Sequence, residues 1–129
     1  MKLTSVYFSA TFTTRRVVDY VSRRLSDQVT KYDITNDAST DEVLLAADEV
    51  LVVGIPVYAG RVPVMAVDRI RRFKGKGSRA VAIAVYGNRH YDDALLELSD
   101  ILSENGFQVI SAGAFLAQHS IFPKVGANR

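Results

Sequence analysis

The segment at positions 9–14 carries four hydroxyl groups and could bind a phosphate group. It reads Ser9, Ala10, Thr11, Phe12, Thr13 and Thr14, and it comes directly before a stretch with helical spacing. Hydroxyl donors and the free N–H groups at the positive end of a helix can hold a terminal phosphate monoester without a lysine. The simpler alternative is a Ser or Thr side chain that caps the helix and binds no ligand.

The positions of the glycines exclude two kinds of phosphate-binding motif at residues 9–14. No glycine occurs before Gly54, so neither the G-x-G-x-x-G dinucleotide fingerprint nor the G-x-x-x-x-G-K-[ST] loop can lie at 9–14. An ATPase and a dinucleotide-binding fold are therefore disfavoured. The chain also lacks a G-x-S-x-G elbow, which disfavours a serine hydrolase.

A second segment presents an aromatic side chain on a restricted backbone. Its candidate binding residues are Pro56, Val57, Tyr58, Ala59, Gly60 and Arg61. Pro56 and Pro63 restrict the chain on either side of the Tyr-Ala-Gly turn, so the ring of Tyr58 could be held for a planar ligand to stack upon. The alternative is that Tyr58 covers the edge of a sheet.

A third segment brings amide, cationic and aromatic groups together in one short turn. It reads Tyr86, Gly87, Asn88, Arg89, His90, Tyr91, Asp92 and Asp93. Gly87 permits a ligand to approach the backbone closely. We interpret Asp92 or Asp93 as the N-cap of the helix that follows rather than as a catalytic pair.

The elements that must position these segments follow from the hydrophobic pattern. Apolar runs without polar alternation predict strands covered on both faces, at 3–8, 49–55, 80–85 and 107–116, with a weaker strand at 30–34. Apolar stripes at helical spacing predict helices within 17–25, 66–73 and 95–102, and a short helix is predicted at 41–47. This alternation predicts an open, parallel, three-layer α/β sheet.

The three candidate segments follow the first, third and fourth of the five predicted strands. Ligands of such sheets bind beyond the carboxyl ends of the strands, where the strand order reverses. The segments are therefore expected to meet at one rim.

The length of 129 residues predicts a single domain spanning 1–129. Residues 118–129 show no helical periodicity, so the last helix of the fold is expected to be missing. Two explanations stay open: the chain is truncated, or a partner such as a second copy covers the face that this leaves bare.

Composition excludes several classes of function. The chain has no Cys, which excludes disulfides, thiolate metal sites, iron–sulfur ligation and a cysteine nucleophile, so redox chemistry would need a cofactor. The absence of Cys and of an N-terminal apolar segment predicts a cytoplasmic protein, and no run is long enough to span a membrane. His90 and His119 have no partner at ligand spacing, so no metal site is expected.

The charge balance does not indicate a nucleic-acid binder. Lys and Arg number 16 against 14 Asp and Glu. A basic cluster does occur, and it consists of Arg69, Arg71, Arg72, Lys74, Lys76 and Arg79. Because no aromatic residue alternates with these side chains to stack bases, we interpret them as a solvated helix end and turn, or as a dock for an acidic electron-transfer partner.

At the three candidate segments together the sequence resembles the flavodoxin family, whose members bind FMN non-covalently. The family's first loop has the form [ST]-x-T-G-x-T, which Ser9, Thr11 and Thr14 match, while Phe12 stands at the glycine position. The stretches PVYAGRVP and VYGNRHYDDALLEL are similar to the flavodoxin domain of flavodoxin–ferredoxin fusion proteins. The resemblance covers essentially the whole chain and implies five parallel strands in the order 2-1-3-4-5.

The resemblance implies an electron carrier rather than a free-standing oxidoreductase. The FMN phosphate would lie at 9–14, and the ring would lie between the Tyr58 segment and residues 86–92. A redox partner protein or domain, of the ferredoxin type, is implied in the same way. If Arg61 and Arg89 reach the N1 and O2 side of the flavin, they would favour its reduced anion, and the hydroquinone potential is expected to be less negative than in an acidic relative.

Three other hypotheses compete with this one. An FMN-dependent NAD(P)H:quinone-type reductase would use the same fold, although no residues here resemble a nicotinamide site. A degenerate domain that no longer binds FMN would result if Phe12 must adopt a positive φ, which costs roughly 1–3 kcal/mol, or if its ring crowds the phosphate. A receiver domain would need acidic residues where Phe8, Ser9 and Gly54 stand.

Overall fold

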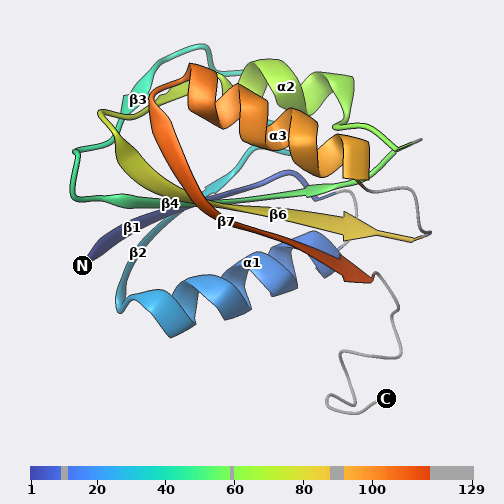
Figure 1. Cartoon of the computed structure of the whole chain (residues 1–129), viewed down its shortest axis with the longest axis horizontal. Helices are drawn as coiled ribbons and strands as arrows, with labels where there is room; N and C mark the ends of the chain where they lie inside the picture. The colour runs from blue at the N-terminus through green and yellow to red at the C-terminus, as the bar shows by residue number, and fades with distance from the viewer. Residues whose placement is uncertain (10–11, 59, 88–91, 117–129) are drawn as a thin grey trace.

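The structure is a computed structural model, and it describes residues 1–9, 12–58, 60–87 and 92–116 (Figure 1). Within these residues a central parallel sheet has five strands in the order β2-β1-β4-β6-β7. Their bounds are β1 Lys2–Tyr7, β2 Gln28–Asp33, β4 Val50–Pro56, β6 Ser78–Tyr86 and β7 Phe107–Leu116. Counted along the chain, this is the predicted order 2-1-3-4-5, so the predicted fold class is confirmed.

Helices cover both faces of the sheet and complete the three layers. The described helices are α1 Phe12–Leu25, α2 Val64–Ile70 and α3 Asp92–Glu104, where the apolar stripes predict helices. The stripe within 66–73 was predicted too long, because the second helix ends at Ile70 and Phe73 lies in a strand. Figure 1 shows α1 on one face and α2 and α3 on the other. In β4, Val50 and Val52 face α1, whereas Leu51 and Val53 enter the core beneath α2 and α3. None of the described helices is long and apolar enough to cross a membrane.

The helix predicted at 41–47 is wrong. That segment is extended and contains β3 (Val43–Leu44), which pairs in parallel with β5 (Phe73–Lys74). The backbone N–H of Val43 donates to the carbonyl of Arg72 at 2.9 Å, and that of Leu45 donates to the carbonyl of Lys74 at 2.8 Å. The apolar run is too short to form a stable helix by itself, and the extended chain offers its N–H groups to a neighbouring segment instead.

Strand β7 also departs from its prediction. It was expected to be covered on both faces, but Ile110 and Phe115 are exposed. The strand contains an irregularity where Val109 pairs with Ala80 and Ser111 pairs with Val81. Helix α3 packs on β7, whereas α1 packs on β1, β4 and β6. The expectation about residues 118–129 lies outside the described residues.

Candidate functional site

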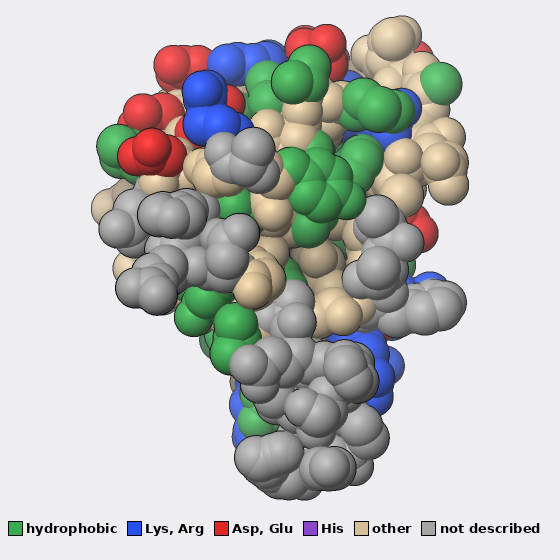
Figure 2. Space-filling view, turned by 90° about the vertical axis from the view of Figure 1, so that its right-hand side faces the viewer, with side chains coloured by type: hydrophobic (Ala, Val, Ile, Leu, Met, Phe, Trp, Pro, Cys, Tyr) green, Lys and Arg blue, Asp and Glu red, His purple; other side chains and the backbone are tan. Residues whose placement is uncertain are grey.

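The candidate segments follow strands whose carboxyl ends lie at one edge of the sheet. Tyr7 in β1 pairs with Gly54 in β4, and Pro56 in β4 pairs with Val85 in β6. Figure 2 views the side toward which the arrows of β6 and β7 point in Figure 1. The predicted rim is therefore present. Several candidate residues lie outside the described part of the chain: Ala10, Thr11, Ala59, Asn88, Arg89 and Tyr91, together with His90.

The first segment carries a helix cap. The hydroxyl Oγ of Ser9 accepts a hydrogen bond from the backbone N–H of Arg15, in the first turn of α1, at 3.4 Å. This contact satisfies one of the free N–H groups of the helix, as the capping alternative predicts. Phe12 is the first residue of α1 and has helical backbone, so the strain expected from a positive φ does not arise.

Helix α1 lies close to the sheet because Gly54 has no side chain. A Cβ atom at Gly54 would lie 2.2 Å from Cγ2 of Val18 and 3.3 Å from Cγ2 of Thr14. Thr14 is buried there, beneath the rim, while Thr13 is half-buried. On the same face the guanidinium of Arg15 lies over the ring of Tyr7 at 5.9 Å, and burial raises the pKa of Tyr7. The close packing fixes where the start of α1 points.

The segment after β2 holds Ser9 in place, which the sequence did not predict. The backbone N–H of Ser9 donates to Oγ1 of Thr35 at 2.8 Å. Thr35 in turn donates to Oδ1 of Asp33 through its hydroxyl at 2.6 Å and its N–H at 3.0 Å. A carboxylate that accepts from the residue two positions later is typical of an Asx turn, so the Asp-x-Thr spacing was an available signal.

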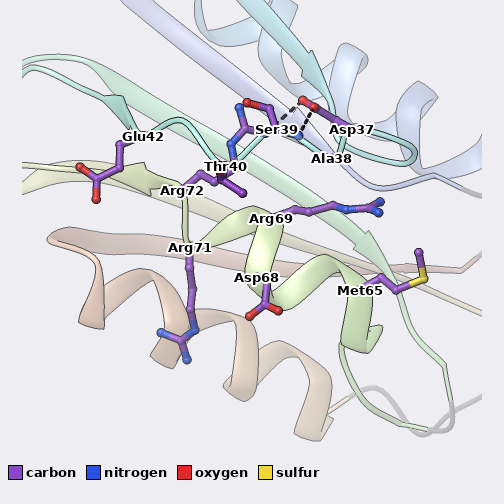
Figure 3. Close-up of a pocket in the computed structure, with 10 residues that line it drawn as sticks. All are labelled: Asp37, Ala38, Ser39, Thr40, Glu42, Met65, Asp68, Arg69, Arg71 and Arg72. Atoms are coloured by element: carbon purple, nitrogen blue, oxygen red, sulfur yellow. Dashed lines mark hydrogen bonds and ion pairs between the residues drawn. The ribbon is translucent and has the colours of Figure 1, made fainter.

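The interpretation of the basic cluster as a solvated helix end is wrong for two of its arginines. Arg69 donates to the carbonyls of Ile34 at 2.9 Å and Thr35 at 2.5 Å. Arg72 is buried and donates to Oδ2 of Asp37 at 3.0 Å, a contact drawn in Figure 3. These arginines bind the segment after β2 to α2, beside an open pocket of about 460 Å³.

The pKa of one carboxylate in this pocket is shifted from its ordinary value. The backbone N–H of Ser39 and then the side chain of Arg72 lower the pKa of Asp37. Figure 3 shows the arginine reaching across to the loop that carries Asp37. These contacts join the segment after β2 to α2. We therefore assign them a structural role and keep the rim as the candidate site.

The second segment forms a closed turn that presents Tyr58. The N–H of Tyr58 donates to the carbonyl of Arg61 at 3.0 Å, and the N–H of Arg61 donates to the carbonyl of Tyr58 at 2.9 Å. Gly60 has a φ of 79°, a conformation that favours glycine. Val57 joins the turn to β6 by donating to the carbonyl of Val85 at 2.9 Å. The Tyr58 residue is 48% exposed, so its ring is available to a ligand.

Arg61 binds α3 through Glu97. Its Nε lies 2.9 Å from Oε1 of Glu97, and its Nη2 lies 3.1 Å from Oε2. Hydrogen bonding to Arg61, and then to the N–H of Val62, lowers the pKa of Glu97, and the same pair raises the pKa of Arg61. In the structure the guanidinium of Arg61 is paired with Glu97, and the expectation that it also reaches a flavin ring stays a prediction. Glu97 is a site residue that the sequence analysis missed.

The third segment is described only at its two ends. Tyr86 ends β6, and Gly87 follows it at the surface. A Cβ atom at Gly87 would meet nothing within 4 Å, so the backbone is open to close approach. Helix α3 begins at Asp92, which places the carboxylate of Asp93 in its first turn, where it complements the helix dipole.

The described residues fit a flavin mononucleotide. A planar ring needs an aromatic face and an open backbone edge, which Tyr58 and Gly87 provide at the ends of neighbouring strands. A phosphate needs N–H donors, and the start of α1 lies at the same rim. The donor set is therefore compatible with both ends of the cofactor.

Comparisons with known proteins support the same fold. No family model and no curated protein matches the chain. Two similar crystal structures are each named a "putative flavoprotein". That from Bacteroides uniformis has a TM-score of 0.64 and 16% identity and covers 98% of both chains. That from Bacteroides eggerthii has a TM-score of 0.62 and 16% identity and covers 90% of this chain and 87% of the other.

A third similar structure contains a cofactor. It is a flavoprotein in complex with FMN from Lactobacillus acidophilus, with a TM-score of 0.59 and 12% identity, and it covers 88% of this chain and 92% of the other. None of the three is named as a fusion protein, so the similarity to flavodoxin–ferredoxin fusions stays a prediction. At these identities the likeness concerns architecture: the chain has the flavodoxin-like fold that these flavoproteins share.

Proposed function

We propose that this chain binds FMN non-covalently at the rim and acts as a flavodoxin-like electron carrier. The observation that carries the proposal is the exposed ring of Tyr58 on a closed turn, at the same sheet edge as the start of α1. The shared fold with flavoproteins, one of them an FMN complex, supports it. Bound FMN would supply reversible uptake of electrons, which the side chains of this Cys-free protein do not provide.

Segment 9–14 would hold the phosphate. The first N–H groups of α1 are the main donors, because the Ser9 hydroxyl already accepts from Arg15. Thr13, half-buried at this end of the helix, would add its hydroxyl, together with Thr11. Thr14 would act from beneath by packing α1 against Gly54. Phosphate affinity would thus depend on backbone dipoles more than on formal charge.

The Tyr58 segment and residues 86–92 would hold the ring. Stacking against the electron-rich Tyr58 in a partly dry site disfavours added negative charge on the flavin, which lowers its reduction potential. Arg61 would oppose this weakly, because Glu97 neutralises its charge at 2.9 Å. The less negative potential expected from the sequence would therefore depend on Arg89. A redox partner protein would take up electrons at this edge.

A titration of FMN fluorescence against Tyr58→Leu tests the proposal. Loss of the aromatic face is expected to weaken binding about two- to thirteenfold, since aromatic stacking contributes about 0.5–1.5 kcal/mol. Tyr20→Leu is the matched control, because Tyr20 is also exposed but lies in the second half of α1. Equal dissociation constants for the parent and Tyr58→Leu, or an equal loss in Tyr20→Leu, would contradict the assignment of the ring site.

A further inference from the structure

We propose that Glu97 is a positioning residue for Tyr58: from α3, it fixes the turn that presents the aromatic ring. The inference rests on the proposed function only in naming FMN as the ligand of that ring. The coupling between Glu97 and the turn is a property of the protein without ligand, so the two can be tested separately.

Three N–H groups of the turn converge on one carboxylate. Nε and Nη2 of Arg61 donate to Oε1 and Oε2 of Glu97 at 2.9 and 3.1 Å, and the backbone N–H of Val62 donates to Oε1 at 3.0 Å. A fork of two parallel bonds fixes an angle as well as a distance. Because the third bond comes from the backbone, Glu97 holds the main chain of the turn and not merely one long side chain.

The turn passes this constraint on to Tyr58. Both backbone bonds between Tyr58 and Arg61 close the turn at 2.9–3.0 Å, so the position of Arg61 determines that of Tyr58. The other end of the constraint is firm, because α3 is anchored to the core by buried Leu98 and Leu102. The position of the Tyr58 ring is thereby fixed by α3 as well as by the strand that precedes it.

The exposure of the pair favours a positioning role over a stabilising one. The Arg61 side chain is 65% exposed and that of Glu97 is 23% exposed. Ion pairs at such positions contribute little to the free energy of unfolding, yet their geometry still orders the groups they join. Arg71, which lines the same groove, binds Glu104 at 2.9 Å rather than Glu97.

Among the described residues, the other acidic side chains near Glu97 in this groove include two from α3 itself. Asp93 lies one turn before it and Asp100 lies about one turn after it, and both line the groove between α2 and α3 with Arg61 and Arg71. Both neighbours are carboxylates, and after the larger effect of Glu97 the charge of Asp93 also raises the pKa of Arg61. Among the described residues, Glu97 is the carboxylate that forms the fork with Arg61 and also accepts from the backbone of Val62.

The absence of tryptophan from the chain gives a direct test. In a Tyr58→Trp protein without FMN, the time-resolved fluorescence anisotropy of the single indole reports the motion of the turn. Adding Glu97→Gln is expected to introduce a fast depolarising motion on the nanosecond scale. Adding Glu104→Gln is the matched control, because it removes a second arginine–glutamate pair of α3, made with Arg71 at the end of α2 and not with the turn, and it should leave the anisotropy unchanged.

A second readout concerns the ligand. With Tyr58 intact, Glu97→Gln should weaken FMN binding about three- to tenfold through the cost of ordering the turn, while thermal unfolding of the free protein shifts little. An indole equally immobile with and without Glu97, or equally mobilised by Glu104→Gln, would overturn the inference. If the indole responds as expected while no variant binds FMN, the positioning role holds and the proposed function fails.

Discussion

Side chains at the rim differ in what they offer to a ligand. The Tyr58 ring is exposed on a closed turn, whereas the Arg61 guanidinium already donates to both oxygens of Glu97. The Ser9 hydroxyl likewise accepts from the first turn of α1. Among the described residues of these segments, the aromatic face and the open backbone at Gly87 are therefore the groups that a planar ligand would meet.

Replacing either of two glycines by alanine should affect stability very differently. Gly54→Ala is expected to cost about 1–3 kcal/mol of the free energy of unfolding, because its Cβ would lie 2.2 Å from Val18. Gly87→Ala should change stability by less than about 0.5 kcal/mol, because nothing lies within 4 Å. Urea denaturation of both variants checks this, and equal midpoints would contradict the close packing of α1 on β4.

The Arg61–Glu97 pair predicts a pH dependence of stability. Contact with Arg61 lowers the pKa of Glu97 below its value in the unfolded chain. The pair therefore stabilises the fold above the ordinary glutamate pKa, and this contribution disappears as the pH falls through the lowered pKa. Glu97→Gln should be slightly less stable than the parent at pH 7, and the gap should close in acid. A gap in urea midpoints that widens toward low pH would contradict this.

At the scale of elements, segment 41–47 shows where sequence patterns fail. Its apolar residues fit a helix as well as a strand, and the choice depends on partners about 30 residues away, at Arg72 and Lys74. The longer patterns predicted their elements correctly. The buried runs of β4 and β6 require packing on both faces, and the apolar stripes of α1 and α3 pack on one face each. Local pattern thus predicted the main layers but not the small sheet of β3 and β5.

Adjacent leucines test the extended form of this segment. Leu45 is 1% exposed and Leu44 is 66% exposed, as alternation along a strand requires. Leu45→Ala is expected to cost about 2–5 kcal/mol, whereas Leu44→Ala should cost less than about 0.5 kcal/mol. Chemical denaturation of the two variants measures the difference. Similar losses at both positions would indicate a different arrangement of residues 43–45.

The candidate site was predictable to the extent that strand ends determine it. Ser9, Tyr58 and Gly87 each follow a predicted strand, and the parallel sheet brings them to one rim. Thr35 and Glu97 were missed, because each contacts its partner across 26 to 36 residues of sequence. Contacts at that separation depend on the register of packed elements, which hydrophobic periodicity does not specify.

At the scale of the whole molecule, the described helices cover the two faces of the sheet unequally. Helices α2 and α3 pack on one face, while α1 packs on the other, over β1, β4 and β6 (Figure 1). This layout leaves Ile110 and Phe115 of β7 exposed. It also places the start of α1 and the Tyr58 turn at the same end of the sheet, so a ligand with a charged tail and a planar head can contact both.

Retention of FMN on desalting tests this arrangement most directly. The protein is incubated with FMN or with riboflavin, desalted, and its absorption recorded, with flavin bands expected at about 375 and 450 nm. Binding at both ends predicts that FMN is retained and riboflavin is lost, because only FMN carries the phosphate that the start of α1 would hold. Loss of both flavins, or equal retention of the two, would contradict a site in which that helix end and the Tyr58 turn act together.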